Sequence, residues 1–194
     1  MYLKPLKNTL SRINFTCNNM EKDKLSPTSL AFIALTNEYC ELVENCSDHG
    51  CEGFVEAMIK LLPRIYITVI DIEPGLDYFD AIITPALEET SYDIVKANLA
   101  SLMGENDVYL EVFLEDMKYS DTPIAVSISE NIADLYQEFY NLVASLRDLN
   151  TEEQKQILGI CKENFVEYWG QTLCNVMRAL HWLSVTNKDY YENY

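Results

Sequence analysis

Apolar residues recur at helical spacing along most of the chain, and this periodicity constrains the fold more than any other feature. The segment SISENIADLYQEFYNLVASLRDL places apolar residues on one face and acidic or amide residues on the other. Ser127 and Glu130, at its start, have the spacing of a capping box. Thr151 and Gln154 repeat that spacing before a long final helix, which we expect to end near Leu183. The second half of the chain is therefore predicted to be helical.

The first half of the chain carries three further helix signals. SPTSLAFIALTNEYCELVEN begins with a capping serine, Ser26, and a proline suited to the first turn, and Gly50 is expected to end this helix. A second helix is expected at 52–71, with Pro63 kinking or splitting it, although its IYITVI run favours a strand. SYDIVKANLASLMG predicts a short helix closed by Gly104.

Only one segment, ENDVYLEVFLEDMKYSDTP, alternates as a strand does. We therefore predict an all-α, single-domain bundle of five to seven helices with a long C-terminal helix. The expected organisation is a weakly ordered basic N-terminal arm at 1–24, a helical domain at 25–185 and a frayed C-terminal tail at 186–194.

The formal net charge of −17 bears on the class of partner. A field of this sign repels phosphate backbones and anionic lipid surfaces, so we expect neither nucleic-acid nor membrane binding. No uninterrupted apolar run reaches the length of about twenty residues that a membrane-spanning helix needs. Six cysteines without a secretory signal favour reduced thiols in the cytoplasm. The expected partner is a protein, and an acidic face would suit a basic one.

One short stretch, EYCELVENCSDHGC, resembles a metal-binding cluster. Cys46 is in register with the core stripe of the first helix, where a thiol behaves as a small apolar side chain. Only His49 and Cys51 fall in the turn, and two ligands do not complete a tetrahedral zinc site. Phosphate-binding loops, nucleophile elbows and inward Glu-x-x-His pairs are absent from the sequence. We predict no metal and no cofactor.

The final helix presents a polar stripe beside a broad apolar arc that includes Val166. Glu167, Arg178 and His181 on that stripe could form a polar pocket for a ligand. Cys174 is one turn from Arg178, which would favour its thiolate, but His181 lies seven residues on, beyond hydrogen-bond reach. We therefore assign no catalytic residue.

Two segments, YSDTPIA-S-SE and WGQ-L-N--RALH, together with NEYCELVEN, resemble a bacterial family known as domain of unknown function 5063. The likeness covers about residues 25–183 and implies an all-helical protein without an assigned activity. Thr172 stands where relatives are expected to carry a histidine, which implies that a histidine-dependent site would be impaired. The resemblance draws attention to Trp169, Gly170, Asn175, Arg178 and His181 in one segment and to Tyr119, Ser120, Asp121 and Pro123 in the other.

The sequence leaves three functions open. The first is a non-enzymatic protein-interaction or ligand-binding module, with candidate residues Glu167, Trp169, Asn175, Arg178, His181, Tyr119 and Asp121. The second is a helical-bundle enzyme, which should enclose Arg178 and His181 in a concave pocket near Trp169. The third is an acidic immunity or inhibitor protein that neutralises a basic partner.

Overall fold

Six α-helices and a two-stranded hairpin make up the part of the chain that the structure describes. A computed structural model describes residues 24–73, 81–110 and 124–192, with side chains as far as residue 186. Residues 1–23 of the expected basic arm, and Tyr119 and Asp121, lie outside these ranges. The helices are α2 (Pro27–Glu44), α3 (Cys46–Ile70), α4 (Glu89–Met103), α5 (Ile128–Ser145), α6 (Thr151–Asn164) and α7 (Gly170–Glu192), with a 3-10 helix η1 (Gly104–Asp107), a π-helix η3 (Phe165–Trp169) and strands β1 (Val108–Leu110) and β2 (Ala125–Ser127). The all-α prediction is confirmed.

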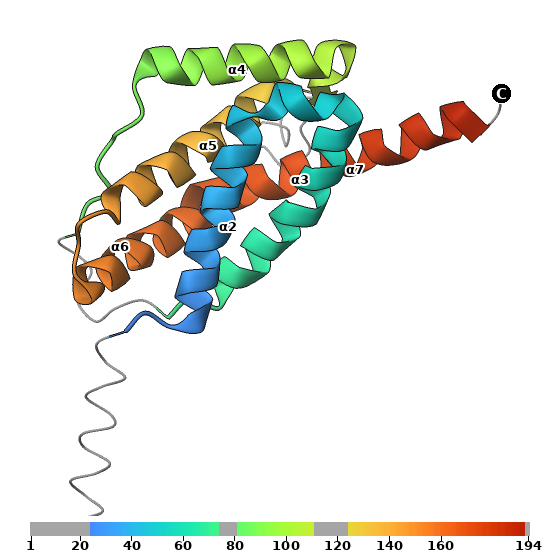
Figure 1. Cartoon of the computed structure of the whole chain (residues 1–194). Coiled ribbons are helices and arrows are strands. Elements are labelled where there is room, and N and C mark those ends of the chain that lie inside the picture. Colours follow the sequence, from blue (N-terminus) through green and yellow to red (C-terminus); the bar gives the residue numbers. More distant parts are fainter. Residues whose placement is uncertain (1–23, 74–80, 111–123, 193–194) are drawn as a thin grey trace, which may run out of the picture.

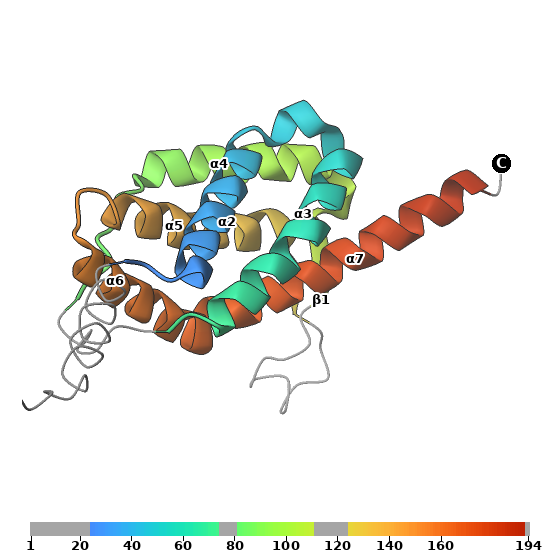
Figure 2. The ribbon, with the colours of Figure 1, turned by 60° about the horizontal axis from the view of Figure 1, so that its bottom comes forward.

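The helices enclose one apolar core. α2 packs against α3 and α5, α3 packs against α7, and α4 lies along α5 at the top of Figure 1. The centre of the core is aromatic: the Trp169 ring lies 5.1 Å from Phe139 and 6.5 Å from Phe32 between ring centroids. The C-terminal part of α7 extends beyond the other helices (Figures 1 and 2).

Two of the expected helix starts are confirmed and one is wrong by a residue. The side chains of Ser26 and Ser127 accept hydrogen bonds from the backbone N–H groups of Ser29 and Glu130. The capping box of α6 is instead formed by Asn150 and Glu153, because Asn150 accepts from two backbone N–H groups and the Glu153 carboxylate accepts from the Asn150 N–H. The prediction of Thr151 as the cap is therefore wrong.

α2 ends at Glu44, so the predicted end of this helix at Gly50 is wrong, and Gly50 instead interrupts the helix α3. Gly50 has φ 65° and ψ 167°, a conformation essentially restricted to glycine, whereas Pro63 lies within α3 without splitting it. The IYITVI run is helical despite its strand propensity, because Ile65 and Val69 are buried in the core. The expected glycine end of α4 is confirmed at Gly104, which has φ 54°.

The expected final helix is a composite of α6, η3 and α7. The π-helix η3 contains a hydrogen bond from the Gly170 N–H to the Phe165 carbonyl oxygen, five residues back. This wider turn shifts the helix face, so Val166, predicted to be apolar core, is 75% exposed. α7 continues to Glu192, and the predicted end near Leu183 is wrong. The backbone of most of the expected tail at 186–194 is thus helical.

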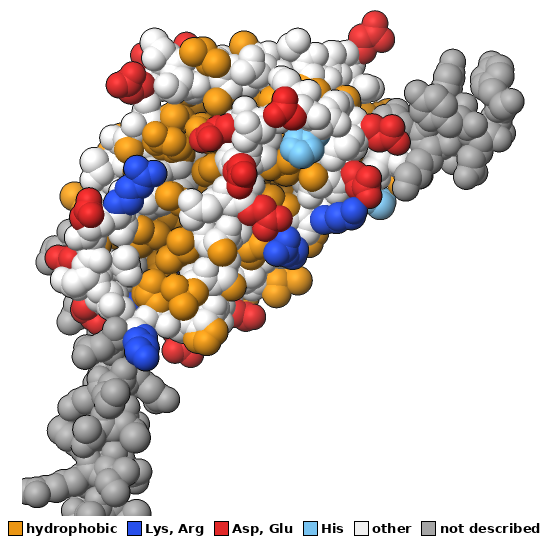
Figure 3. All heavy atoms as spheres, viewed as in Figure 1, with side chains coloured by type: hydrophobic (Ala, Val, Ile, Leu, Met, Phe, Trp, Pro, Cys, Tyr) orange, Lys and Arg blue, Asp and Glu red, His pale blue; other side chains and the backbone are white. Residues whose placement is uncertain are grey.

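β1 and β2 pair in antiparallel register, with Tyr109 opposite Val126. Their pairing confirms strand character at the start of the alternating segment, whose residues 111–123 lie outside the described ranges. Within the described residues, no helix is both long and apolar enough to cross a membrane. On the face shown in Figure 3, acidic side chains are scattered among apolar and basic ones and form no continuous acidic surface.

Candidate functional site

The candidate residues of the final helix do not meet in one pocket. Trp169 and Asn175 are buried, whereas Glu167, Arg178 and His181 are exposed. Glu167 and Trp169 line one pocket, and Arg178 lines another. His181 lines neither of these two pockets, so the described residues do not form the enclosure around Arg178 and His181 that an enzyme was expected to have.

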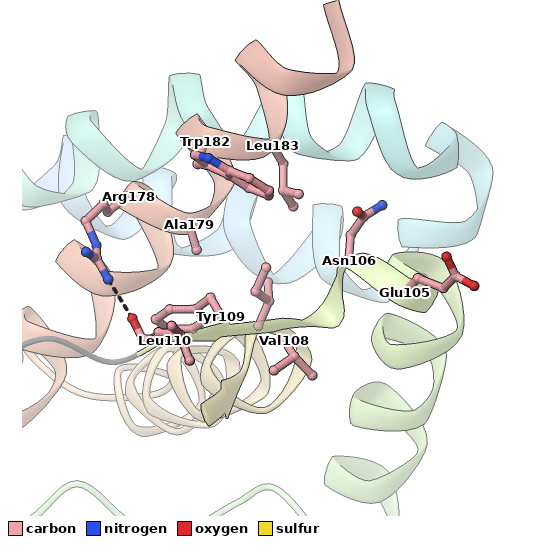
Figure 4. A pocket seen from close by; sticks show the side chains of 10 residues that line it. Glu105, Asn106, Val108, Tyr109, Leu110, Arg178, Ala179, Trp182 and Leu183 are labelled. Atoms are coloured by element: carbon pink, nitrogen blue, oxygen red, sulfur yellow. Dashed lines mark hydrogen bonds between the residues drawn. The ribbon is translucent and has the colours of Figure 1, made fainter. Parts of the chain in front are cut away.

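The pocket that Arg178 lines, which we call the α7 groove, lies between β1 and α7. Its volume is about 540 Å³. Trp182 and Leu183 on α7 face Val108 and Tyr109 on β1 across the groove (Figure 4). The groove is lined by Glu105, Asn106, Val108, Tyr109, Leu110, Ile128, Arg178, Ala179, Trp182 and Leu183.

Large apolar side chains of the α7 groove are open to solvent. Trp182 is 64% exposed, Val108 is 65% exposed and Leu110 is 56% exposed. Arg178 Nη2 donates a hydrogen bond of 2.8 Å to the Leu110 carbonyl oxygen, which ties the two walls together at one end. The groove is therefore preformed, apolar and accessible.

A partly buried polar cluster holds the β1 wall in place. Asp107, at the end of η1, accepts hydrogen bonds from the Ser129 N–H at 2.7 Å and from the Ser129 hydroxyl at 2.8 Å. The Ser127 hydroxyl also donates to Asp107, at 2.8 Å. A carboxylate at the N-terminus of α5 is favoured by the helix dipole. Asp107 and Ser129 were not among the predicted residues, because they are 22 positions apart and form no sequence motif.

The pocket that Glu167 and Trp169 line, which we call the acidic pocket, lies between α5 and the η3–α7 junction. Its volume is about 480 Å³. Three carboxylates, those of Asp134, Glu138 and Glu167, are among its lining residues, and none of the described residues that line it is Lys or Arg. The full set is Asp134, Leu135, Gln137, Glu138, Glu167, Tyr168, Trp169, Gln171 and Thr172.

The carboxylates of the acidic pocket differ in their surroundings. Asp134 accepts a hydrogen bond of 2.6 Å from the Tyr92 hydroxyl of α4. Burial raises the pKa of Glu138, a hydrogen bond from Asn164 opposes this, and the charge of Asp134 adds to the rise. Glu167 is exposed, on the π-helix. Burial and the neighbouring carboxylate therefore disfavour the charged form of Glu138, which is the most buried of the three acids.

Trp169 is the most buried polar side chain of the acidic pocket. It is 3% exposed, and its ring contacts Phe165 at 4.7 Å between centroids. Its indole Nε1–H is buried and has no hydrogen-bond partner in the described structure. A buried N–H without an acceptor is costly, by about 1–3 kcal/mol.

The cysteine and histidine stretch is part of the core and its edge. Cys46 is buried, as predicted, and His49 is exposed. Cys51 is half-buried, with its sulfur 3.9 Å from that of Met103. No group of three or more potential metal ligands is found among the described residues. Burial raises the pKa of Cys174, so its thiolate is disfavoured in spite of nearby Arg178.

These features define an all-helical protein with a preformed apolar groove and a separate acidic pocket, both at the final helix. The chain belongs to the family Domain of unknown function (DUF5063), whose model matches residues 23–186. The family resemblance of the sequence is thereby confirmed.

A solved structure supports the fold. Protein BF1032 from Bacteroides fragilis, determined by crystallography in a structural genomics programme, has 28% sequence identity to this chain and a TM-score of 0.68. The match covers 80% of this chain and 91% of that one. A comparison with curated proteins gives no match.

Proposed function

We propose that this protein is an interaction module whose α7 groove binds a basic, amphipathic segment of a partner protein. The observation that carries the proposal is the group of solvent-exposed apolar side chains around the groove, Val108, Leu110 and Trp182. Exposed tryptophan in a concave apolar surface is typical of the residues that dominate binding energy in protein interfaces.

The shape of the groove favours a helical segment as its ligand. One wall is the helix α7 and the other is the short strand β1, and apolar side chains line both (Figure 4). Amphipathic helices bind such grooves through apolar residues spaced by three or four positions. The Leu110 carbonyl is already bonded to Arg178, which removes one acceptor that an added β-strand would use.

The charge of the protein favours basic residues on the polar side of that segment. Glu105 and Arg178 are the charged residues among those that line the groove, so the attraction for a basic segment comes from the net charge of −17 of the whole chain. Complementary charge accelerates encounter and excludes acidic competitors. A cytoplasmic location is part of the proposal, supported by the five unpaired cysteines of the described structure.

The two other functions receive less support. An enzyme built on Glu167, Arg178 and His181 lacks a common pocket for these residues. An immunity or inhibitor protein needs an acidic face, and the one face shown in Figure 3 does not present it, because its acidic groups are scattered. The proposed partner is basic, as it is for an immunity or inhibitor protein, but the apolar groove is what binds it.

The test is a selection of displayed random peptides against the purified full-length protein. We expect the selected peptides to combine apolar residues at helical spacing with Lys and Arg. Trp182→Ala should weaken their binding by at least about tenfold, since such residues contribute about 2 kcal/mol or more at interfaces. Ile94→Ala, which removes an exposed apolar side chain from α4, is the matched control and should leave the dissociation constant unchanged.

Peptides that are selected for acidic residues would contradict the proposal. Equal affinity of the selected peptides for the wild type and Trp182→Ala would contradict it as well. Because Trp182 is largely exposed, its truncation should not change the free energy of unfolding, which a urea titration checks.

A further inference from the structure

We propose that residues 3–13 of the N-terminal arm form an amphipathic helix that docks on an exposed apolar face of α2 and α3 in the same chain. The docking surface, which we call the α2–α3 face, consists of Leu30, Ala31 and Ala34 on α2 and Ile67 and Ile70 on α3. It shares no residue with the lining of the α7 groove. The inference therefore does not rest on the proposed function.

Apolar side chains of the α2–α3 face are open to solvent. Leu30 is 55% exposed, Ile67 is 62% exposed and Ile70 is 45% exposed. Ala31, Ala34 and Ile67 also line a groove between the two helices, with a volume of about 480 Å³. Figure 3 shows apolar side chains gathered over α2 and α3 on this side of the molecule. Exposed apolar surface of this kind marks an interaction site.

The shape of the α2–α3 face suits a third helix. Ala31 and Ala34 have small side chains, which let another helix axis approach closely. At the far end of the face, Arg64 forms an ion pair with Glu38 at 3.2 Å. The apolar part of α2 therefore extends from Pro27 to this ion pair, about 16 Å at the helical rise.

The arm carries a matching apolar stripe. Its apolar residues recur at intervals of three and four positions, which places them on one face of a helix. They are Leu3, Leu6, Leu10 and Ile13. Pro5 falls in the first turn, where proline is tolerated. A helix over residues 3–13 is about 15 Å long, close to the length of the face, and a helix this short gains its stability by packing its apolar stripe.

The arm leads directly to the α2–α3 face. α2 begins at Pro27, and Leu30 is one turn further on. Ile67 lines the same groove as Ala31, so the end of α3 lies beside the start of α2. Residues 14–26 join the arm helix to α2, which is more chain than a turn between neighbouring helices needs. Since consecutive elements usually pack side by side, connectivity favours the arm as the occupant of this face.

Charge favours the same pairing. Residues 1–20 contain Lys4, Lys7 and Arg12 and no acidic residue. Because the whole chain carries −17, residues 21–194 hold a net charge of −20. The three basic side chains fall outside the apolar stripe of the arm helix, so they remain in solvent when the stripe is docked. The arm is therefore attracted to the rest of its own chain.

The end of the α2–α3 face where the arm enters is itself acidic. Asp71 and Glu73 follow Ile70 and are exposed. Lys162 Nζ donates a hydrogen bond of 2.7 Å to the Ile70 carbonyl oxygen and offsets one of these two charges. Arg12, in the last turn of the arm helix, brings a positive charge to this end when the arm helix runs antiparallel to α2.

The first test is limited trypsin digestion of the full-length protein, followed by mass spectrometry. Trypsin cleaves after Lys7 and Arg12, and we expect this cleavage to be at least about tenfold slower than in a synthetic peptide of residues 1–20, because a docked segment is cut only from its undocked fraction. Ile67→Asp should restore the rate of the peptide. Ile94→Asp is the matched control, since Ile94 on α4 is also 62% exposed, and the arm should stay protected.

A second test observes the face while the variant lies in the arm. Leu10→Asp should shift the side-chain methyl resonances of Ile67 and Ile70 in a ¹H–¹³C NMR spectrum and leave that of Ile94 in place. Asn8→Asp introduces the same charge on the opposite side of the arm helix, so this matched control should shift none of them. Because residue 10 lies outside the described helices, its substitution leaves their packing intact.

Five results would overturn the inference. Three of them are cleavage of the wild-type arm at the rate of the free peptide, equal cleavage of Ile67→Asp and Ile94→Asp, and equal methyl shifts from Leu10→Asp and Asn8→Asp. Release of the arm by Trp182→Ala would place it in the α7 groove instead. Protection that rises with protein concentration would show that a second copy, and not the same chain, receives the arm.

Discussion

At the scale of single residues, burial governs the chemistry of the cysteines. Cys40, Cys46 and Cys161 lie in the core, whereas Cys51 and Cys174 are half-buried. Burial, followed by the charge of Glu44, raises the pKa of Cys40 to about 12. Burial likewise raises the pKa of the thiols of Cys161 and Cys174. Since the thiolate is the reactive form, these side chains are poor nucleophiles.

Thiol labelling of the folded protein at pH 8 should therefore proceed in two classes. A thiol with a pKa near 12 is ionised in only about one molecule in ten thousand at that pH. We expect 5,5′-dithiobis(2-nitrobenzoate) to modify Cys40 and Cys161 only after unfolding, and Cys51 and Cys174 more slowly than free glutathione. Mass spectrometry of the labelled peptides assigns each site, and fast labelling of Cys161 in the folded protein would contradict the expectation.

Individual residues were predictable from the sequence where their partners are local. Ser26 and Ser127 cap helices through N–H groups three residues on, and a sequence displays such spacing directly. Glu130 completes the same motif in the sequence, yet its carboxylate pairs with Lys96 of α4. Asp107 caps α5 across 22 residues, so its role follows from the fold and from no local pattern.

At the scale of elements, the π-helix η3 is the main departure from the predicted pattern. The predicted faces assume an α-helix of 3.6 residues per turn, in which each N–H bonds to the carbonyl oxygen four residues back. One bond that spans five residues rotates the side chains after it relative to those before it. The rotation puts Val166, which lies within the π-turn, out of register with the apolar face of α7, so Val166 is exposed. It also places Glu167 at the acidic pocket and Arg178 at the α7 groove, rather than on one polar stripe.

Two glycine substitutions test this element. Gly170→Ala should lower the free energy of unfolding by about 1–3 kcal/mol, since its Cβ would lie 2.4 Å from a carbonyl oxygen and 2.9 Å from the Phe165 ring. Gly53→Ala, within α3, is the matched control, because its Cβ would meet only the Cβ of His49 at 3.7 Å. It should raise the free energy of unfolding by up to about 1 kcal/mol.

Urea titrations of both variants measure the difference between these glycines. Helix propensity alone predicts the same stabilising sign for the two substitutions. Opposite signs are expected only if the π-turn requires a residue without a side chain. Stabilisation by Gly170→Ala would show that η3 relaxes to a regular α-helix at little cost.

At the scale of the whole molecule, the fold class was predictable because each helix carries its own periodic pattern. The placement of the groove was not, because it depends on contacts between distant segments: Arg178 and Leu110 are 68 positions apart. The family model matches residues 23–186, and the Bacteroides fragilis structure covers 80% of the chain. The feature of the sequence that bears on the partner is the net charge of the chain.

The net charge of −17 attracts a basic partner from a distance, whereas the α7 groove contributes only once the partner is in contact with it. Charge at long range changes association rates and is screened by salt, with a Debye length of about 10 Å at 0.1 M and about 3 Å at 1 M. Apolar contacts determine how long the complex lasts, and salt affects them little. For a basic peptide bound in the groove, the two rate constants should therefore respond differently to ionic strength.

We expect the association rate constant of a selected basic peptide to fall by at least about tenfold between 0.05 and 0.5 M NaCl, as electrostatic steering predicts. The dissociation rate constant should change by less than about threefold, since it depends on the apolar contacts. Stopped-flow fluorescence of Trp182 measures both, and Trp182→Ala with a labelled peptide should instead raise the dissociation rate constant. If salt raised mainly the dissociation rate constant, surface ion pairs rather than the apolar groove would hold the partner.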